Sequence, residues 1–363
     1  MLKIFNYNRE IGNEDFNNLV DCTLDLARAT YEGKKATDYE EKNRTVLEGF
    51  AKFAVKNTAF EADYEAKGLA AFNSRMLNRN TTVREQFNLV LAQVVNAIVP
   101  EVVNGEFERY IAEVRQIGYG DTARFTIESN DLFKVNAKAE GVRKGVDQPM
   151  YDNEYTVNPR PMEISTHMDW YPFASGVFDM GNFAVKIARS FEAQIFLRAI
   201  KGMLLAENKF GAAYTINGIT PVLWGTLKQR VRAANGGAGV IAIGTEVALS
   251  NVALGGNYQV QIGEEMNKVG YLDQYLSTPL IALKNVLVPG TTNGLATLAL
   301  ADNKIYMIPV AGDRPVKIVF EGNEVVVEYD PEHTSDTRYG LTVTMRVGIA
   351  AICGSKYGTI NLQ

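Results

Sequence analysis

Apolar residues recur at helical spacing through the first hundred positions of the chain. The spacing predicts four helices, over residues 15–31, 39–55, 59–77 and 83–99. Thr82, with Glu85 three residues later, has the form of a capping box at the start of the fourth helix, and Pro100 is expected to end it. The first three helices have narrow apolar faces, so we expect them to form an arm or satellite and not a core of their own.

From residue 111 onward the apolar period changes to two, which is typical of β-strands. Alternating positions predict strands within residues 124–128, 155–157 and 162–165. A long loop separates the first two strands and carries basic residues and flexible glycines: Lys138, Arg143, Lys144, Gly141 and Gly145. Such a loop is usually functional or disordered, and a solvated surface loop is the alternative; residue content alone leaves these open.

A single long helix is predicted at residues 182–207, where an apolar stripe lies opposite lysines and arginines. Asp179 and Asn182 are the candidate N-caps. About 26 residues at roughly 1.5 Å each make a rod of about 39 Å. Because strands are predicted on either side of it, we expect this helix to lie across a sheet as a spine, with packing in a helix bundle as the alternative.

Helices and strands alternate after this rod, which predicts an α/β lobe. The predicted elements of the lobe are a helix at 221–234, a strand at 240–243, a helix at 245–254 and a further helix near 263–274. Residues 317–320 and 324–329 are expected to pair as a hairpin around Gly322, and alternation over residues 341–347 predicts a closing strand. Helices and strands together predict the α+β class.

The composition is that of a globular protein made inside the cell. Apolar residues make up 46% of the 363 positions, which is ample for a buried core. The formal net charge of −5 gives no broad positive field, so binding of nucleic acid by the whole surface is not expected. Cys22 and Cys353 are expected to be small core residues. Residues 1–13 lack the core of a signal peptide, and the longest apolar stretch, residues 89–99, is too short to span a membrane.

Motifs that carry chemistry are scarce. Residues 118–123 match a loose dinucleotide-binding pattern, but a strand is predicted where that pattern needs a helix. His333 lies among the carboxylates of residues 330–336, which could hold a hard cation, although a turn between two strands uses the same residue types. We therefore expect no catalytic residue, no cofactor and no metal site. A soluble enzyme with a site near His333 or His167 is kept as an alternative.

The predicted elements follow in a distinctive order: helical arm, strand, long loop, returning strand, spine helix, α/β lobe, hairpin and final strand. This order resembles that of the major capsid proteins of tailed bacteriophages, which share the HK-ninety-seven-type fold. The resemblance is carried by residues 140–149 and 155–159 of the loop, the step from Asp179 into the long helix, residues 240–249, and residues 338–347 of the closing strand.

The resemblance implies a shell subunit with four parts. These are a helical N-terminal arm at residues 1–93, a peripheral domain with the spine helix at 94–124, 166–213 and 317–350, an extended loop at 125–165, and an axial domain at 214–316 and 351–363. Many copies, made in the host cytoplasm, would assemble into the pentamers and hexamers of an icosahedral virion shell. The shell would enclose double-stranded DNA without sequence-specific binding. Scaffolding, portal and decoration proteins would be further partners, and no membrane would be involved.

The extended loop is the expected contact between subunits. Its candidate interface residues are Lys138, Glu140, Gly141, Arg143, Lys144 and Gly145. The strands that lead to the loop tip would expose edges that can pair with an adjacent subunit. A cellular nanocompartment shell with the same fold is a second hypothesis, which an enzyme cargo in place of DNA would favour.

Overall fold

The computed structural model describes residues 14–33, 37–72, 76–77, 80–103, 111–127, 132–137, 140, 148, 153–254, 270–283, 285–290, 295–310, 313–352 and 354–362. The chain divides into two units. Unit 1 comprises Met1–Asn104, Pro159–Glu192 and Phe320–Val347, and unit 2 comprises Gly105–Asn158, Ala193–Val319 and Gly348–Gln363. Each unit thus combines segments far apart in sequence. The four parts predicted from the resemblance, from the N-terminal arm to the axial domain, are not tested by this division and stay a prediction.

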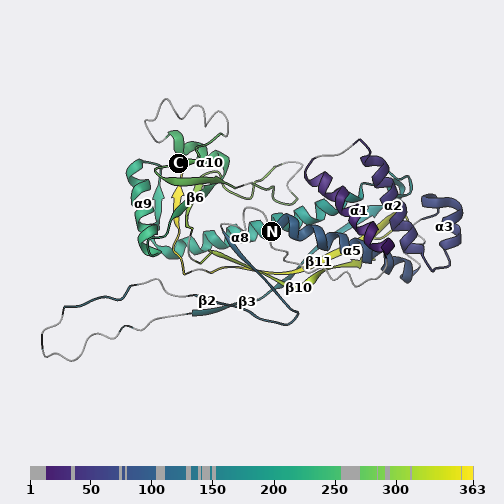
Figure 1. The fold of residues 1–363 in the computed structure, drawn as a ribbon, viewed down its shortest axis with the longest axis horizontal. Helices are drawn as coiled ribbons and strands as arrows, with labels where there is room; N and C mark the ends of the chain where they lie inside the picture. The colour runs from purple at the N-terminus through teal and green to yellow at the C-terminus, as the bar shows by residue number, and fades with distance from the viewer. Residues whose placement is uncertain are drawn as a thin grey trace. The chain divides into compact units, whose positions relative to one another are not determined.

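The N-terminal part of unit 1 is helical, as predicted (Figure 1). Its helices are α1 (Glu14–Tyr31), α2 (Tyr39–Val55), α3 (Glu61–Lys67), the 3-10 helix η1 (Gly68–Ala71) and α5 (Thr81–Val103). The predicted bounds of α2 are confirmed, whereas the single helix expected over residues 59–77 is wrong. Gly68 takes a φ of 63°, in the left-handed region, and α3 ends at the residue before it.

Helix α5 begins and ends differently from the prediction. Asn80, and not Thr82, caps it, because Asn80 Oδ1 accepts hydrogen bonds from the backbone N–H groups of Thr82 at 3.0 Å and Val83 at 3.3 Å. The helix also continues through Pro100 to Val103. A proline removes the hydrogen bond to one carbonyl four residues earlier, and the remaining bonds of the helix can carry it past that position.

An aromatic cluster in the core of unit 1 joins segments that are far apart in sequence. Its members are Phe50 of α2, Phe72 after η1, Phe87 of α5, Trp170 and Phe173 of α7 (Trp170–Ala174) and Tyr339 of β11 (Arg338–Ala351). Neighbouring ring centroids lie 5.5–6.2 Å apart, mostly tilted or edge-on. The N-terminal helices therefore bury their apolar faces in a core that later segments complete.

Cys22 lies outside this core. The buried stripe of α1 passes through Phe16, Val20 and Leu24, and position 22 falls on the opposite, exposed face. The prediction of a buried Cys22 is therefore wrong. Cys353 lies outside the described residues.

Helix α8, Met180–Phe210, is the predicted long helix extended at both ends to 31 residues, or about 46 Å. Asp179 caps it, since Asp179 Oδ1 accepts a hydrogen bond from the backbone N–H of Asn182 at 2.9 Å. The same oxygen accepts a hydrogen bond from the Tyr39 hydroxyl at 2.6 Å, which ties α2 to the start of α8. The described helices include none that combines the length and the apolar character needed to cross a membrane.

Four strands form a sheet in the order β1-β10-β11-β4. They are β1 (Ala112–Ile117), β10 (Val316–Tyr329), β11 (Arg338–Ala351) and β4 (Arg160–Asp169). β11 and β4 are antiparallel, from Arg338 opposite Asp169 to Val347 opposite Arg160. The hairpin predicted around Gly322 is wrong, because β10 continues through that glycine, whose φ of 77° is typical of a bulge inside a strand.

Unit 2 contains a second sheet of six strands, in the order β5-β12-β9-β6-β8-β7. Its strands are β5 (Thr215–Asn217), β12 (Gly358–Asn361), β9 (Lys304–Pro309), β6 (Val240–Gly244), β8 (Thr278–Ala282) and β7 (Gln274–Tyr275). Helices α9 (Pro221–Ala234) and α10 (Glu246–Leu254) pack on the sheet, and the predicted bounds of α9 are confirmed. Thr220 and Thr245 cap the two helices through their hydroxyl oxygens. Most of the helix predicted near 263–274, up to residue 269, lies outside the described residues. At its predicted end, Gln274 belongs to strand β7.

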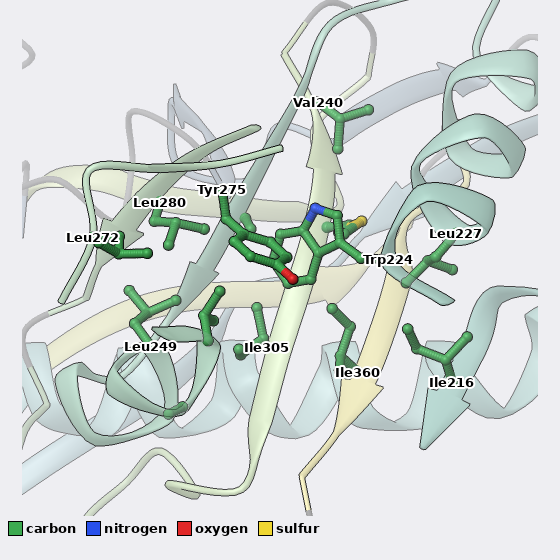
Figure 2. Packing of buried hydrophobic residues seen from close by; sticks show 14 of the residues in the cluster. Ile216, Trp224, Leu227, Val240, Leu249, Leu272, Tyr275, Leu280, Ile305 and Ile360 are labelled. Atoms are coloured by element: carbon green, nitrogen blue, oxygen red, sulfur yellow. The ribbon is translucent and has the colours of Figure 1, made fainter. Parts of the chain in front are cut away.

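Trp224 lies at the centre of the core between α9, α10 and this sheet (Figure 2). Its ring meets that of Tyr275 edge-on, with centroids 5.0 Å apart, and Ile305 and Ile360 contribute from β9 and β12. The C-terminal part of α8 also contacts the segment before β12: the Tyr357 hydroxyl donates to the Met203 carbonyl at 2.6 Å. Helices packed on sheets give the described residues the α+β class that the sequence predicts.

Candidate functional site: a hairpin with open edges

Strands β2 (Ala123–Ile127) and β3 (Asn153–Val157) form a two-stranded sheet of their own (Figure 1). They are antiparallel, from Ala123 opposite Val157 to Ile127 opposite Asn153. Within the described residues neither strand pairs with a third, so each has an outer edge that no further strand covers. These strands confirm the two that the sequence predicts at the base of the long loop.

The hairpin is anchored at its root by a small apolar cluster. Ala123 and Phe125 of β2 and Val157 of β3 pack with Val319 of β10. On β2, buried and exposed residues alternate along the strand, whereas on β3 Val157 is the buried residue and the other four are exposed. Beyond the root, the hairpin is therefore largely solvated in the isolated chain.

Apolar side chains are exposed on the arm that follows β2. The side chains of Leu132, Phe133 and Val135 are 95%, 58% and 94% exposed, and Tyr155 on β3 is also exposed. Burial of one such side chain is worth about 1.5–3 kcal/mol, so leaving several in water forgoes a substantial stabilisation. An apolar surface of this kind is typical of a contact site for another protein.

Gln148 joins the two arms beyond the strand ladder. Its side-chain amide donates to the Lys134 carbonyl at 2.8 Å, and its Oε1 accepts from the Lys134 backbone N–H at 2.6 Å. A side chain here provides the pair of hydrogen bonds that an opposite strand residue would provide. The arms are thereby held together seven positions after the end of β2 at Ile127.

The structure places the predicted interface residues unevenly. Glu140 is an exposed turn residue. The other candidates lie outside the described residues, so their part in an interface stays a prediction: Lys138, Gly141, Arg143, Lys144 and Gly145. The exposed apolar arm was not predicted, although the run from Leu132 to Val135, between a strand and a basic loop, indicates it in the sequence.

The residues around His333, which were the alternative candidate for an enzyme site, form a hydrogen-bonded turn. His333 Nδ1 lies 2.7 Å from Asp330 Oδ2, and Asp330 Oδ1 accepts from the backbone N–H groups of Glu332 and His333. Desolvation raises the pKa of Asp330, but the hydrogen bonds from His333 and the backbone lower it by more. The pKa of Asp330 therefore lies below its ordinary value. Among the described residues no group of three or more His, Cys, Asp or Glu could hold a metal ion. His167 lies on β4, exposed and opposite Gly340.

A comparison with protein families gives a match over nearly the whole chain. The family model described as "YonB: SPbeta prophage-derived putative capsid protein YonB" matches residues 15–361. No curated protein sequence matches.

Several solved structures of shells are similar in arrangement. The mature capsid of bacteriophage PhiM1 is 8% identical, with a TM-score of 0.47 over 71% of this chain and 87% of that chain. The Mycobacterium phage Ogopogo structure is also 8% identical, with a TM-score of 0.47 over 71% of this chain and 92% of that chain. The virus-like particle from Pyrococcus furiosus is 10% identical, with a TM-score of 0.43 over 76% of this chain and 100% of that chain. The assignment to a family depends on the sequence match alone.

Proposed function

Because the chain belongs to the family of SPbeta prophage-derived putative capsid proteins YonB, we propose that it is the major capsid subunit of an icosahedral shell. The family membership confirms the prediction of a phage-type capsid protein. The match over residues 15–361 is the observation that carries the proposal. Many copies assemble into pentamers and hexamers, and the role of the chain is structural and not enzymatic.

The hairpin is the proposed clasp between neighbouring subunits. Its open strand edges supply backbone donors and acceptors, and Leu132, Phe133 and Val135 supply apolar surface that water now covers. A contact between unlike surfaces of two copies repeats by rotation and closes into a ring. The predicted loop residues, with Gly141 and Gly145 as pivots, complete this clasp.

The shell encloses double-stranded DNA without reading its sequence. The net charge of −5 supports this role, because a strongly basic container would bind its polyanionic contents tightly. The chain is made in the host cytoplasm and becomes part of the virion. Scaffolding, portal and decoration proteins are its further proposed partners.

Purification of the chain and imaging by negative-stain electron microscopy test the proposal. We expect closed particles above a threshold concentration, accompanied by a fast-sedimenting species in analytical ultracentrifugation. A chain that stays monomeric at every salt and protein concentration contradicts the proposal. Particles from the natural source that contain an enzyme and no DNA would instead identify a nanocompartment shell.

A further inference from the structure

A buried lysine lies under the root of the hairpin. Lys317 on β10 is 1% exposed, and an ammonium group in such a place is costly unless it is paired. Its Nζ donates to Glu113 Oε2 of β1 at 2.5 Å and to Asp313 Oδ1, just before β10. Both carboxylates are partly exposed, so the burial falls mainly on the cation.

The same lysine faces the aromatic ring that anchors the hairpin. Lys317 Nζ lies 5.4 Å from the centroid of the Phe125 ring, and Arg115 Cζ lies 4.2 Å from it. Arg115 also donates to the backbone carbonyl of Arg124 at 2.9 Å and to Glu113 Oε1 at 2.9 Å. Phe125, from the middle of β2, is thus contacted by two cations, and each of these cations is bonded to Glu113.

Hydrogen bonds also fix the carboxylates of this cluster. Asp313 Oδ2 accepts from the backbone N–H of Gly354 at 3.2 Å, and the Asp313 N–H donates to Ser355 Oγ at 2.9 Å. Desolvation raises the pKa of Glu113, but the hydrogen bonds and charges of Lys317 and Arg115 outweigh it, and the pKa lies below its ordinary value. The cluster thus contains two cations and two carboxylates that are bonded to one another.

We propose that Lys317 is a positioning residue for the hairpin, and that the cluster of Lys317, Glu113, Asp313 and Arg115 fixes the hairpin root in the orientation that the clasp needs. Three of the four members belong to the β1–β10 side of the sheet, and Phe125 is the member of the hairpin that they hold. This inference rests on the proposed function of the hairpin. It adds a buried residue that acts through Phe125.

The test measures hydrogen exchange in the unassembled chain, so it does not depend on a shell being formed. The variant is Lys317→Met, which keeps the length of the side chain and removes the charge. We expect the backbone amides of residues 123–127 and 153–157 to exchange about tenfold faster, which corresponds to about 1.4 kcal/mol. Exchange of these amides at the rate of the unchanged chain overturns the proposal.

Lys304→Met is the matched control. Lys304 Nζ pairs with Glu207 Oε2 at 3.1 Å in the same unit, and neither residue belongs to the cluster at the hairpin root. The control removes the same kind of ion pair, so we expect slow hairpin exchange and normal assembly. Equal acceleration of hairpin exchange in both variants shows a general loss of stability and overturns the positioning role.

A third variant covers the case in which Lys317→Met does not fold because its two carboxylates lose their partner. Replacement of a buried ion pair or triad by uncharged groups of similar volume is often tolerated. We expect the variant with Glu113→Gln, Asp313→Asn and Lys317→Met to fold and still to show fast hairpin exchange. Slow hairpin exchange in this variant overturns the proposal.

Assembly is measured separately in the same variants. We expect Lys317→Met to raise the threshold concentration for particles, and Lys304→Met to leave it unchanged. If the clasp itself is wrong, deletion of the loop leaves assembly normal. The exchange experiment then still decides whether Lys317 holds the hairpin root.

Discussion

Removing the exposed apolar arm should impair assembly and leave the subunit folded. The variant replaces Leu132, Phe133 and Val135 with serine. All three side chains are more than half exposed in the single chain, and exposed substitutions change the free energy of unfolding by about 0.5 kcal/mol or less. The thermal unfolding midpoint of the unassembled variant should therefore equal that of the unchanged chain.

The effect on assembly follows from the apolar surface. Full burial of the three side chains is worth roughly 4.5–9 kcal/mol, at about 1.5–3 kcal/mol each. If a neighbour covers half of that surface, the loss is roughly 2–4 kcal/mol for each subunit. Since a factor of ten in concentration corresponds to about 1.4 kcal/mol, the threshold concentration for particles should rise at least about tenfold.

Sedimentation velocity over a dilution series measures this threshold. The control replaces Leu205 on α8 and Val222 on α9 with serine, since these side chains are exposed to a similar degree and belong to other elements. We expect the control to assemble near the normal threshold. A threshold for the hairpin variant within about threefold of the unchanged chain refutes the reasoning, as does an equal rise in the control.

Three further predictions follow from single features of the chain. Deletion of residues 139–148 should leave the circular dichroism spectrum and unfolding midpoint nearly unchanged but abolish particles in electron micrographs; normal shells would disprove the clasp. Gly340→Ala should lower the free energy of unfolding by about 1–3 kcal/mol in urea titrations, because the added Cβ would clash with the Asp330 carbonyl oxygen, and a neutral result would contradict this. Glu113 has a folded pKa below its unfolded value, so it stabilises the chain above the unfolded pKa and this contribution is lost as the pH falls through the folded pKa. In Glu113→Gln the acid side of the stability curve should therefore be flatter, and an unchanged pH profile would argue against a charged Glu113.

The sequence predicts regular elements best where local signals suffice. The bounds of α2 and α9 follow from helical periodicity, and Thr220 followed by a proline marks the start of α9. The β10 strand shows the opposite case. Gly322 and Asn323 have turn chemistry, but pairing with the neighbouring strand β11 favours an extended strand with a bulge. The local turn propensity of these two residues is outweighed by pairing with β11, which lies further along the chain and cannot be inferred from the residues around Gly322 alone.

Part of the candidate site could also be found from the sequence. The strands at the base of the long loop follow from their alternation, and their pairing is confirmed. The cluster at the root could not be predicted, because Glu113, Phe125 and Lys317 come together only through three separate strands. In sequence, Lys317 is one more charged residue at the start of a strand. That this side chain is only 1% exposed depends on tertiary structure alone.

Stability and assembly draw on different residues in this chain. The aromatic cluster of unit 1 and the Trp224 core of unit 2 are buried within single units, so substitutions there act first on folding. Leu132 and Val135 contribute little to the folded subunit, because water already surrounds them. Lys317 lies between these cases: it is buried within unit 2, yet the group that it holds is the root of the exposed hairpin. In the proposed function, such a subunit folds before it meets another copy, and the hairpin is the proposed source of the free energy that brings copies together.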